Sequence, residues 1–293
     1  LSSNDITTTR TLLHEVVPIT GSIVSGTYGE TNTTTEFPNE NSIKNYSHGM
    51  FQSVYDYPYL SSSANQIFDM TVGYSTSSTW AHSKDPIPDG NNVQNTQKLN
   101  IYNQMAQVLM GHDHTGSIKE FQIPGGDVLR EAYFINFSRL LIKDEIKKGS
   151  LTMSFGTGST FTTAHDYNGS PRKLYDYGDT TYYTDSPAGD YAVLTMSSNP
   201  PDPEQGGKPA GLIFYQAGVV VLSASMFFPY DSANIQPEVD HDIDNYINIT
   251  GSGASLAKDD DNLSFRHLLV SSSITGTTNA LRHRIDSIEF HNT

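Results

Sequence analysis

The sequence predicts a mainly β protein: an antiparallel β-sandwich-like domain with one or two packed helices and an extended N-terminal arm. Its 293 residues include 17 Tyr and 13 Phe, and only 17% are charged, below the roughly 25% usual for soluble domains. Aromatic residues together with Thr and Val favour strands. From about residue 130 onward, short alternating runs are separated by turn residues, a spacing typical of antiparallel sandwiches.

The main helix is predicted at residues 96–110. Its apolar residues recur with the spacing of one helical face: Ile101, Tyr102, Met105, Val108 and Leu109. Thr96 or Asn95 is expected to cap the free amides at its start, and Gly111 is expected to end it in the left-handed conformation. Ser61 or Ser63 is expected to cap a second, short helix, whose apolar residues are Ile67, Phe68 and Met70.

Strands with a period of two residues follow the main helix. Alternating patterns predict them at three places: 130–140, 151–155 and 283–290. In the first of these, Tyr133, Ile135 and Phe137 share one face. The most apolar run, 212–228, is split by Gly218 into two β-branched and aromatic halves. We therefore expect this run to form a buried hairpin or two core strands rather than a membrane span.

The chain is expected to divide at about residue 50 into an N-terminal arm (1–50) and a β-rich structural domain (51–293). The arm is rich in Thr, Ser and Asn, and its one apolar segment is interrupted by Pro18. Two interpretations stay open, namely an arm that becomes ordered against a partner subunit and a mobile terminus. Because the chain begins with Leu1 rather than Met, we expect a processed chain or part of a longer polypeptide.

The charge and composition exclude several classes of protein. The formal net charge is −15 and the pI is about 4.9, and the 17 Lys and Arg residues are scattered along the chain. Binding nucleic acid would need clustered basic residues, so no nucleic-acid partner is expected. The absence of Cys excludes disulfide scaffolds and thiolate zinc sites. No apolar run reaches the roughly 18 to 20 residues needed for a membrane span.

Neither a catalytic nor a metal motif is present in full. The chain contains no nucleophile elbow, no zinc-protease motif and no phosphate-binding glycine loop. His112 and His114 follow the main helix and would point to the same side of a strand, which suits metal ligation, but no third or fourth ligand is identifiable. A calcium-like run at 240–244 has Asn245 and Gly251 where Gly and Glu are required. No catalytic residue, metal or cofactor is therefore predicted.

Five tyrosines are the candidates for partner binding: Tyr55, Tyr57, Tyr59, Tyr182 and Tyr183. The first three alternate and would share one face of an extended strand. The last two lie in residues 168–190, which together with 199–211 are expected to be exposed loops. These tyrosines would form either a platform that stacks on sugars or on a partner, or an interface or core edge that holds polar hydroxyls.

Six segments resemble virion structural proteins of contractile-tailed marine cyanophages: NQIFDMTVGYS (65–75), LNIYNQMAQVLMGHDHTGSIKEF (99–121), REAYFINFSRLLIKDEIKKGSLTMSFGTG (130–158), DSPAGDYAVL (185–194), GLIFYQAGVVVLS (211–223) and SSITGTTNALRHRIDSIEFHNT (272–293). The resemblance spans roughly residues 50–293. It implies a particle component of the tail, baseplate or neck that lies in the virion and is assembled in the host cytoplasm. Its partners would be other virion proteins and copies of itself, and it would not be an enzyme.

Three hypotheses of function follow. The first is the structural protein of a tailed phage particle, which works through repeated subunit contacts. The second is a host-surface module whose tyrosines stack on glycans. The third is a polysaccharide-degrading enzyme, because the two carboxylates of a glycosidase need no local motif.

Overall fold

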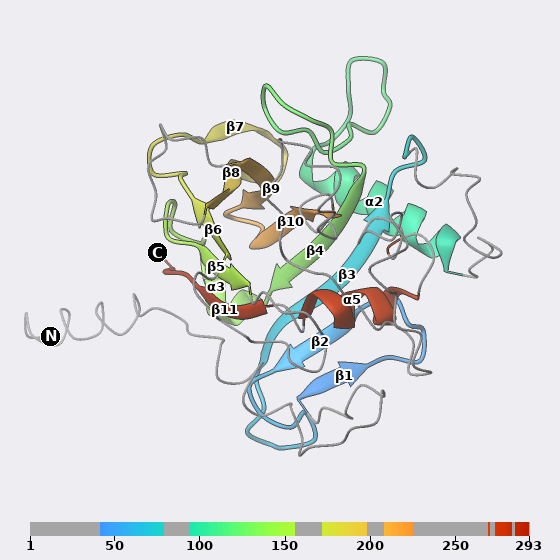
Figure 1. Cartoon of the computed structure of the whole chain (residues 1–293), viewed down its shortest axis with the longest axis vertical. Helices are drawn as coiled ribbons and strands as arrows, with labels where there is room; N and C mark the ends of the chain where they lie inside the picture. Colours follow the sequence, from blue (N-terminus) through green and yellow to red (C-terminus); the bar gives the residue numbers. More distant parts are fainter. Residues whose placement is uncertain are drawn as a thin grey trace, which may run out of the picture.

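The computed structural model describes residues 42–78, 94–155, 172–197, 208–224, 269, 273–282 and 285–292. Within these ranges the protein is mainly β, as predicted (Figure 1). Eleven strands form one sheet: β1 (Ile43–Asn45), β2 (Gln52–Tyr55), β3 (Gln66–Tyr74), β4 (Glu131–Phe137), β5 (Thr152–Phe155), β6 (Arg172–Asp176), β7 (Tyr183–Ser186), β8 (Gly189–Ser197), β9 (Lys208–Phe214), β10 (Val219–Ser223) and β11 (Ile285–Glu289). The helices of these ranges are α2 (Asn95–Leu109), α3 (Arg139–Ile142) and α5 (Ile274–Arg282).

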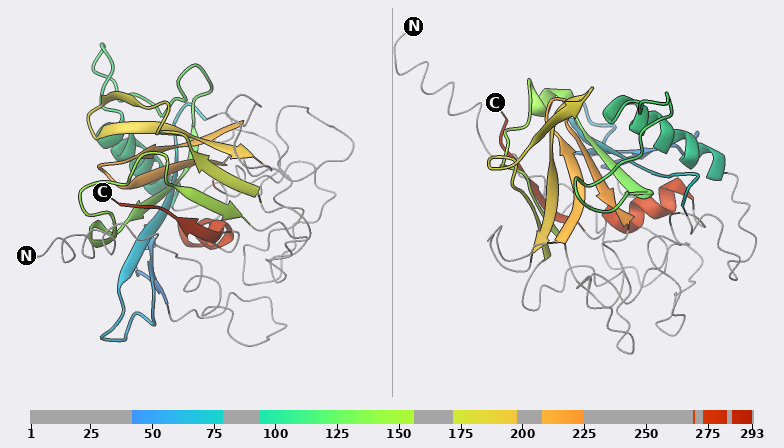
Figure 2. Two further views of the ribbon diagram at one scale, coloured as in Figure 1. Left: turned by 90° about the vertical axis from the view of Figure 1, so that its left-hand side faces the viewer. Right: turned by 90° about the horizontal axis from the view of Figure 1, so that it is seen from above.

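The sheet is antiparallel throughout and strongly curled. Its strands follow the order β1-β2-β3-β4-β10-β9-β8-β6-β5-β11, while β7 pairs with β8 beside this path. The sheet does not close, because β1 and β11 stand at opposite ends of the order. It nevertheless bends back on itself: the ring of Phe290, just after β11, lies 5.0 Å from the ring of Phe137 in β4. The two halves of the sheet therefore face each other in a sandwich-like arrangement (Figure 2).

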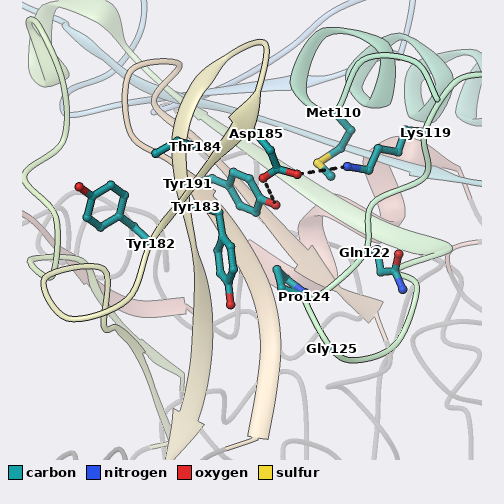
Figure 3. Close-up of a pocket in the computed structure, with 10 residues that line it drawn as sticks. All are labelled: Met110, Lys119, Gln122, Pro124, Gly125, Tyr182, Tyr183, Thr184, Asp185 and Tyr191. Atoms are coloured by element: carbon teal, nitrogen blue, oxygen red, sulfur yellow. Dashed lines mark hydrogen bonds and ion pairs between the residues drawn. The ribbon is translucent and has the colours of Figure 1, made fainter. Parts of the chain in front are cut away.

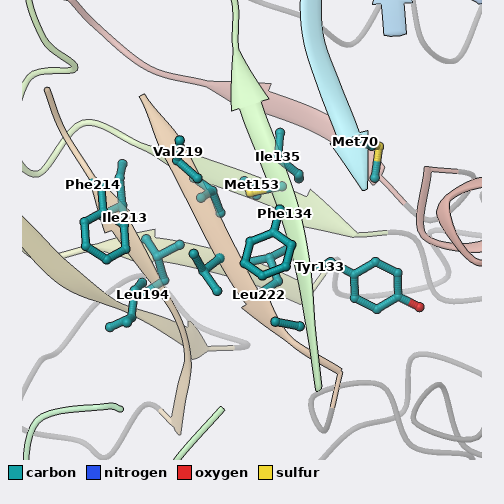
Figure 4. Packing of buried hydrophobic residues seen from close by; sticks show 14 of the residues in the cluster. Met70, Tyr133, Phe134, Ile135, Met153, Leu194, Ile213, Phe214, Val219 and Leu222 are labelled. Atoms are coloured by element: carbon teal, nitrogen blue, oxygen red, sulfur yellow. The ribbon is translucent and has the colours of Figure 1, made fainter. Parts of the chain in front are cut away.

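The inner face of the curl is lined by apolar side chains; Figure 4 shows some of them, such as Met70, Ile135 and Ile213, together with buried residues of the other face. Side chains of directly paired residues point to the same face of a sheet, so the strand register identifies this face. The following inner-face residues are fully buried: Phe68, Met70, Ile135, Val220, Ile213, Leu194, Leu174, Met153 and Ile288. Their burial contributes to the hydrophobic stabilisation of the fold.

Helices α2 and α5 pack on opposite sides of β3 (Figure 2). Gly73 allows α2 to approach closely, because a Cβ atom at this position would lie only 2.7 Å from the backbone oxygen of Lys98. On the other side, the buried Gln52 of β2 donates a hydrogen bond to Asn279 of α5 (2.7 Å) and accepts one from Thr278 (2.7 Å). Each helix thus has its own specific attachment to the sheet.

The prediction of the main helix is confirmed, with differences in detail. Gly111 has a φ of 76° and follows the helix, as expected of a left-handed terminator. The residue before the helix is Gln94, which makes no side-chain capping bond, so the predicted capping by Asn95 or Thr96 is wrong. The assignment of Val108 to the apolar face of the helix is also wrong, because its side chain is 64% exposed. The buried face runs through Lys98, Tyr102 and other residues on a stripe rotated away from Val108.

The strand predictions at 130–140, 151–155 and 283–290 are confirmed by β4, β5 and β11. The hairpin of β9 and β10 is also confirmed, with Gly218 (φ 66°) in its turn. The short helix expected at Ile67, Phe68 and Met70 is wrong, because these residues lie in β3. Residues 168–190 are not one exposed loop either, because they contain β6 and β7, whose Tyr and Thr residues suit strands.

Several predicted segments lie outside the described residues. They include residues 1–41 of the expected arm, most of the segment 199–211 and the calcium-like run 240–244. The remainder of residues 1–50 contains β1, which pairs with β2 in the sheet. A search of the helices in the described ranges finds none with both the length and the hydropathy to cross a membrane.

Candidate functional site

Two consecutive loops between α2 and β4 share one pattern of backbone hydrogen bonds, offset by ten residues. We call residues 111–119 the first finger and residues 121–129 the second finger. Their matching N–H to C=O bonds are Lys119 to Gly111 (3.0 Å) and Leu129 to Phe121 (2.7 Å) at the bases, and Asp113 to Ser117 (2.8 Å) and Ile123 to Asp127 (3.0 Å) near the tips. Both fingers project at the same end of the sheet (Figure 1).

The tip of the first finger is organised by the carboxylate of Asp113. Its Oδ1 atom accepts hydrogen bonds from the backbone N–H groups of Thr115 (2.8 Å) and Ser117 (3.0 Å) and from the Thr115 hydroxyl (2.6 Å). These bonds, that of the Thr115 hydroxyl first, lower the pKa of Asp113 below its usual value. Gly116, with a φ of 84°, completes the turn. The tip is therefore ordered although it is exposed to solvent.

The bases of both fingers are attached to α2. The Tyr102 hydroxyl accepts a hydrogen bond from the Phe121 N–H (3.3 Å) and donates one to the Leu129 carbonyl (2.7 Å), so it bridges the two arms of the second finger. In the first finger, the Gly111 N–H donates to the carbonyl of Ala106 within the last turn of the helix (3.1 Å). The helix, which is itself seated on Gly73, thus fixes where both fingers point.

A series of ring contacts connects the surface with the buried base of the second finger. Tyr183 of β7 stacks on Tyr191 of β8 at 5.3 Å, and Tyr191 stacks on Phe214 of β9 at 5.2 Å. Phe214 contacts Phe121 at 6.4 Å, and Phe121 contacts Tyr102 at 5.5 Å. Tyr191 and Phe214 lie on the outer face of the sheet. Because Phe121 and Tyr102 continue this series of contacts, the second finger and α2 cover the same face, beside β7 and β8.

A groove of about 500 Å³ lies between the β7–β8 hairpin and the fingers (Figure 3). This volume falls within the roughly 300 to 1,000 Å³ typical of small-molecule sites. On one side of the groove, Tyr183 and Asp185 come from β7; on the other, Gln122 and Pro124 come from the second finger (Figure 3). The remaining lining residues are Met110, Lys119, Gly125, Tyr182, Thr184 and Tyr191.

Asp185 is held in place from two directions. The Tyr191 hydroxyl donates to its Oδ1 atom at 2.9 Å, and Lys119 Nζ lies 3.4 Å from its Oδ2 atom. The hydrogen bond from Tyr191, which is the largest cause, and the charge of Lys119 both lower the pKa of Asp185 below its usual value. Asp185 is consequently ionised at neutral pH. The hairpin is also tied to the helix, because the Ser186 hydroxyl donates to the Leu109 carbonyl at 2.5 Å.

The five candidate tyrosines separate into two groups. Tyr182 and Tyr183 line the groove, and the Tyr182 ring, which is 48% exposed, is also contacted by Lys148 Nζ at 4.9 Å. Tyr55, Tyr57 and Tyr59 do not share a strand, so that prediction is wrong. Tyr55 ends β2, and a turn closed by the Ser61 N–H and the Pro58 carbonyl (2.7 Å) follows. Tyr57 is 59% exposed there.

His112 and His114 both lie on the first finger and are exposed. No group of three or more His, Cys, Asp or Glu residues in the described part of the chain is arranged to hold a metal ion. The two histidine side chains therefore lie exposed on a projecting loop.

Apart from Tyr182 and Tyr183, the sequence predictions missed the residues that line the groove, among them Lys119, Asp185 and Tyr191. A local signal did exist for the fingers, because Gly116 and the pair Gly125 and Gly126 punctuate two successive ten-residue segments. No local signal connects the fingers with β7, since Lys119 and Asp185 are 66 residues apart in the chain.

Comparison with models of known protein families finds no match, and searches of curated proteins and of solved structures find none either.

Proposed function

We propose that this chain is a structural component of a tailed bacteriophage virion, located in the tail, baseplate or neck. It would act through contacts with other virion proteins and with copies of itself, and it would be assembled into the particle in the host cytoplasm. The observation that carries the proposal is the pair of fingers, both fixed to α2 and both exposing their tips at one end of the sheet. The cyanophage resemblance of residues 99–121 and 130–158 supports it.

Ordered loops suit assembly contacts for an energetic reason. Binding through a flexible loop costs conformational entropy, whereas a loop that is already held in place loses little. The carboxylate of Asp113 orders the first tip, and the Tyr102 hydroxyl orders the base of the second finger. A neighbouring subunit would therefore meet two surfaces of fixed shape. Such a role requires neither a catalytic group nor a cofactor.

The sheet supplies the rigid support that such contacts need. Its inner-face side chains are fully buried, α2 packs directly on Gly73, and the second finger also contacts the sheet through Phe121 and Phe214. Specific, stable interfaces between subunits commonly bury more than about 1,000 Å² in total.

The test compares two substitutions that each place a carboxylate on the surface. His114→Glu changes the exposed tip of the first finger, and Leu60→Glu changes an exposed position (86%) in the turn region after β2. Purified wild-type and variant chains are mixed with the remaining virion proteins, and their incorporation into particles is measured by quantitative mass spectrometry. Circular dichroism checks that both variants keep the wild-type thermal stability.

We expect His114→Glu to reduce incorporation by about tenfold or more, because a buried unpaired charge at an interface costs at least about 1.4 kcal/mol. Leu60→Glu is expected to leave it near the wild-type level. Equal incorporation of the wild type and His114→Glu would argue against contacts through the first finger. Absence of the wild-type chain from purified particles would overturn the proposal as a whole.

A further inference from the structure

We propose that the groove between β7 and the second finger binds a neutral saccharide, with one sugar ring packed on Tyr183. This inference goes beyond assembly contacts and does not depend on them. It gives the groove a ligand class and assigns roles to residues of the fingers and of the β7–β8 hairpin. On the particle proposed above, the groove would be a site for host-surface glycans; the binding of a saccharide by the free chain does not require that particle.

Tyr183 is the stacking platform. Its ring is half-buried and rests on Tyr191, which in turn rests on the buried Phe214, so the ring is supported from behind and still reaches the groove. The face of an aromatic ring is electron-rich and attracts the weakly positive C–H groups of a sugar. A ring fixed in this way loses little side-chain entropy when a sugar packs on it.

Pro124 lies on the opposite side of the groove from Tyr183 (Figure 3). It belongs to the second finger, whose turn is fixed by a bond from the Gly126 N–H to the Ile123 carbonyl (2.8 Å). A pyranose ring whose hydroxyls are all equatorial, as in glucose, presents C–H groups on both faces, so a groove with an apolar group on each side matches such a ring. The attachment of the second finger to Tyr102 keeps the two sides at a constant separation.

The polar groups of the groove suit hydroxyl groups. Asp185 is ionised. Its Oδ1 atom accepts one hydrogen bond from Tyr191 and its Oδ2 atom is paired with Lys119, so each oxygen retains a lone pair that can accept from a sugar hydroxyl. Lys119 is a donor, and the exposed amide of Gln122 is both a donor and an acceptor. A sugar that carries adjacent hydroxyls can pair with such a set simultaneously.

The charge balance favours a neutral ligand. The ammonium group of Lys119 and the carboxylate of Asp185 lie 3.4 Å apart and largely cancel each other. A strongly anionic or cationic ligand would have to meet one partner of the same sign, at a cost. A neutral saccharide with apolar ring faces and polar edges avoids this cost.

The test uses four neutral disaccharides as probes: maltose, cellobiose, lactose and N,N′-diacetylchitobiose. Each is titrated to about 10 mM against the full chain, and binding is followed by saturation-transfer NMR, which detects millimolar dissociation constants. Three variants are compared with the wild type. Tyr183→Ala removes the platform, Gln122→Ala removes an exposed hydrogen-bonding group, and Tyr57→Ala removes an exposed tyrosine that does not line the groove.

We expect saturable binding of at least one probe. For that probe, Tyr183→Ala should raise Kd by about tenfold or more and Gln122→Ala by about threefold, while Tyr57→Ala should leave Kd unchanged. Because the Gln122 side chain is exposed, its variant tests the groove even if Tyr183→Ala fails to fold. The proposal is overturned if none of the four probes binds, or if Gln122→Ala and a folded Tyr183→Ala both bind like the wild type. Occupation of the groove by a neighbouring protein, with no saccharide bound by the free chain, also overturns it.

Discussion

The hydroxyl group of Tyr102 donates a hydrogen bond to the carbonyl oxygen of Leu129 across 2.7 Å. In an ordinary antiparallel pair, the N–H of Phe121 would donate directly to that carbonyl, because paired residues exchange two bonds. Here the pair keeps one direct bond, from Leu129 to Phe121, and the hydroxyl replaces the second. A side chain of α2 is therefore part of the second finger.

Replacing Tyr102 by Phe should loosen this finger without emptying the core. The ring contacts with Phe121 and Phe134 remain, but the Leu129 carbonyl and the Phe121 N–H lose their partner. We expect the unfolding free energy to fall by about 1 to 3 kcal/mol, because buried polar groups are left unpaired. The backbone N–H of Phe121 should exchange with solvent faster in this variant than in the wild type. Tyr57→Phe, at an exposed ring, is the control, and unchanged exchange at Phe121 in the Tyr102 variant would contradict the bridging role.

Gly73→Ala tests the close approach of α2 to β3. The new Cβ atom would meet the Lys98 carbonyl oxygen at 2.7 Å and the Tyr102 nitrogen at 2.8 Å, and backbone atoms cannot rotate away. Overpacking of this kind costs about 1 to 3 kcal/mol. Gly126→Ala serves as the control, because its nearest atom is a side-chain carbon of Ile123 at 3.2 Å. Chemical denaturation should separate the two variants; equal stability would show that the helix does not rest on Gly73.

Lys98 should make the stability of the protein depend on pH. Its side chain is buried in α2, and burial lowers its pKa from 10.5 to about 7. Between these two values the unfolded chain binds a proton that the folded chain does not. The unfolding free energy therefore rises as the pH rises from about 7 toward 10.5.

Replacing Lys98 by Met removes this titration while keeping a side chain of similar length. Relative to Lys98→Met, the wild type should gain up to about 1.4 kcal/mol per pH unit between about pH 7 and pH 9. Urea denaturation at several pH values measures the difference. Parallel pH profiles for the two proteins would mean that Lys98 keeps its ordinary pKa in the folded chain. Lys119→Met, at a position that is only partly buried, controls for the loss of a charge.

Asp176 should be much less tolerant of change than its partner Tyr215. The buried carboxylate accepts hydrogen bonds from the Tyr215 hydroxyl (2.6 Å) and from the N–H groups of Gly178 and Gly149 (2.8 Å each). Asp176→Asn turns one acceptor oxygen into a donor, so at least one of these donors loses its acceptor.

We expect Asp176→Asn to cost about 2 to 3 kcal/mol and Tyr215→Phe about 1 kcal/mol, measured by thermal or chemical unfolding. The larger effect belongs to Asp176 because it joins two turns, whereas Tyr215 contributes a single hydroxyl. A greater loss for Tyr215→Phe would contradict this assignment.

Residues with a regular apolar period were predicted well from the sequence. The helix at Asn95–Leu109, the strand at Glu131–Phe137 and the hairpin around Gly218 each follow from a local pattern of apolar and polar residues in the sequence. Residues 66–74 were assigned wrongly in part, because a short apolar run suits a helix or a strand equally. Pairing with both β2 and β4 decides in favour of a strand, and such pairing is not a local property.

The candidate site was predicted only in part. Tyr182 and Tyr183 were recognised as aromatic residues in a polar segment, but their neighbours come from the fingers and from β8. The burial of Lys98 was also invisible, since a lysine in a helix is normally read as part of the solvated face. Both features arise from contacts between distant segments, which a period of two or 3.6 residues cannot encode.

Cryo-electron microscopy of the purified phage particle, with this chain traced in the density, tests the proposed structural role most directly. The fingers are predicted to lie in contacts with neighbouring subunits that bury more than about 1,000 Å² in total. A particle that lacks the chain, or one in which both fingers extend into solvent with no neighbour against them, would contradict the proposal.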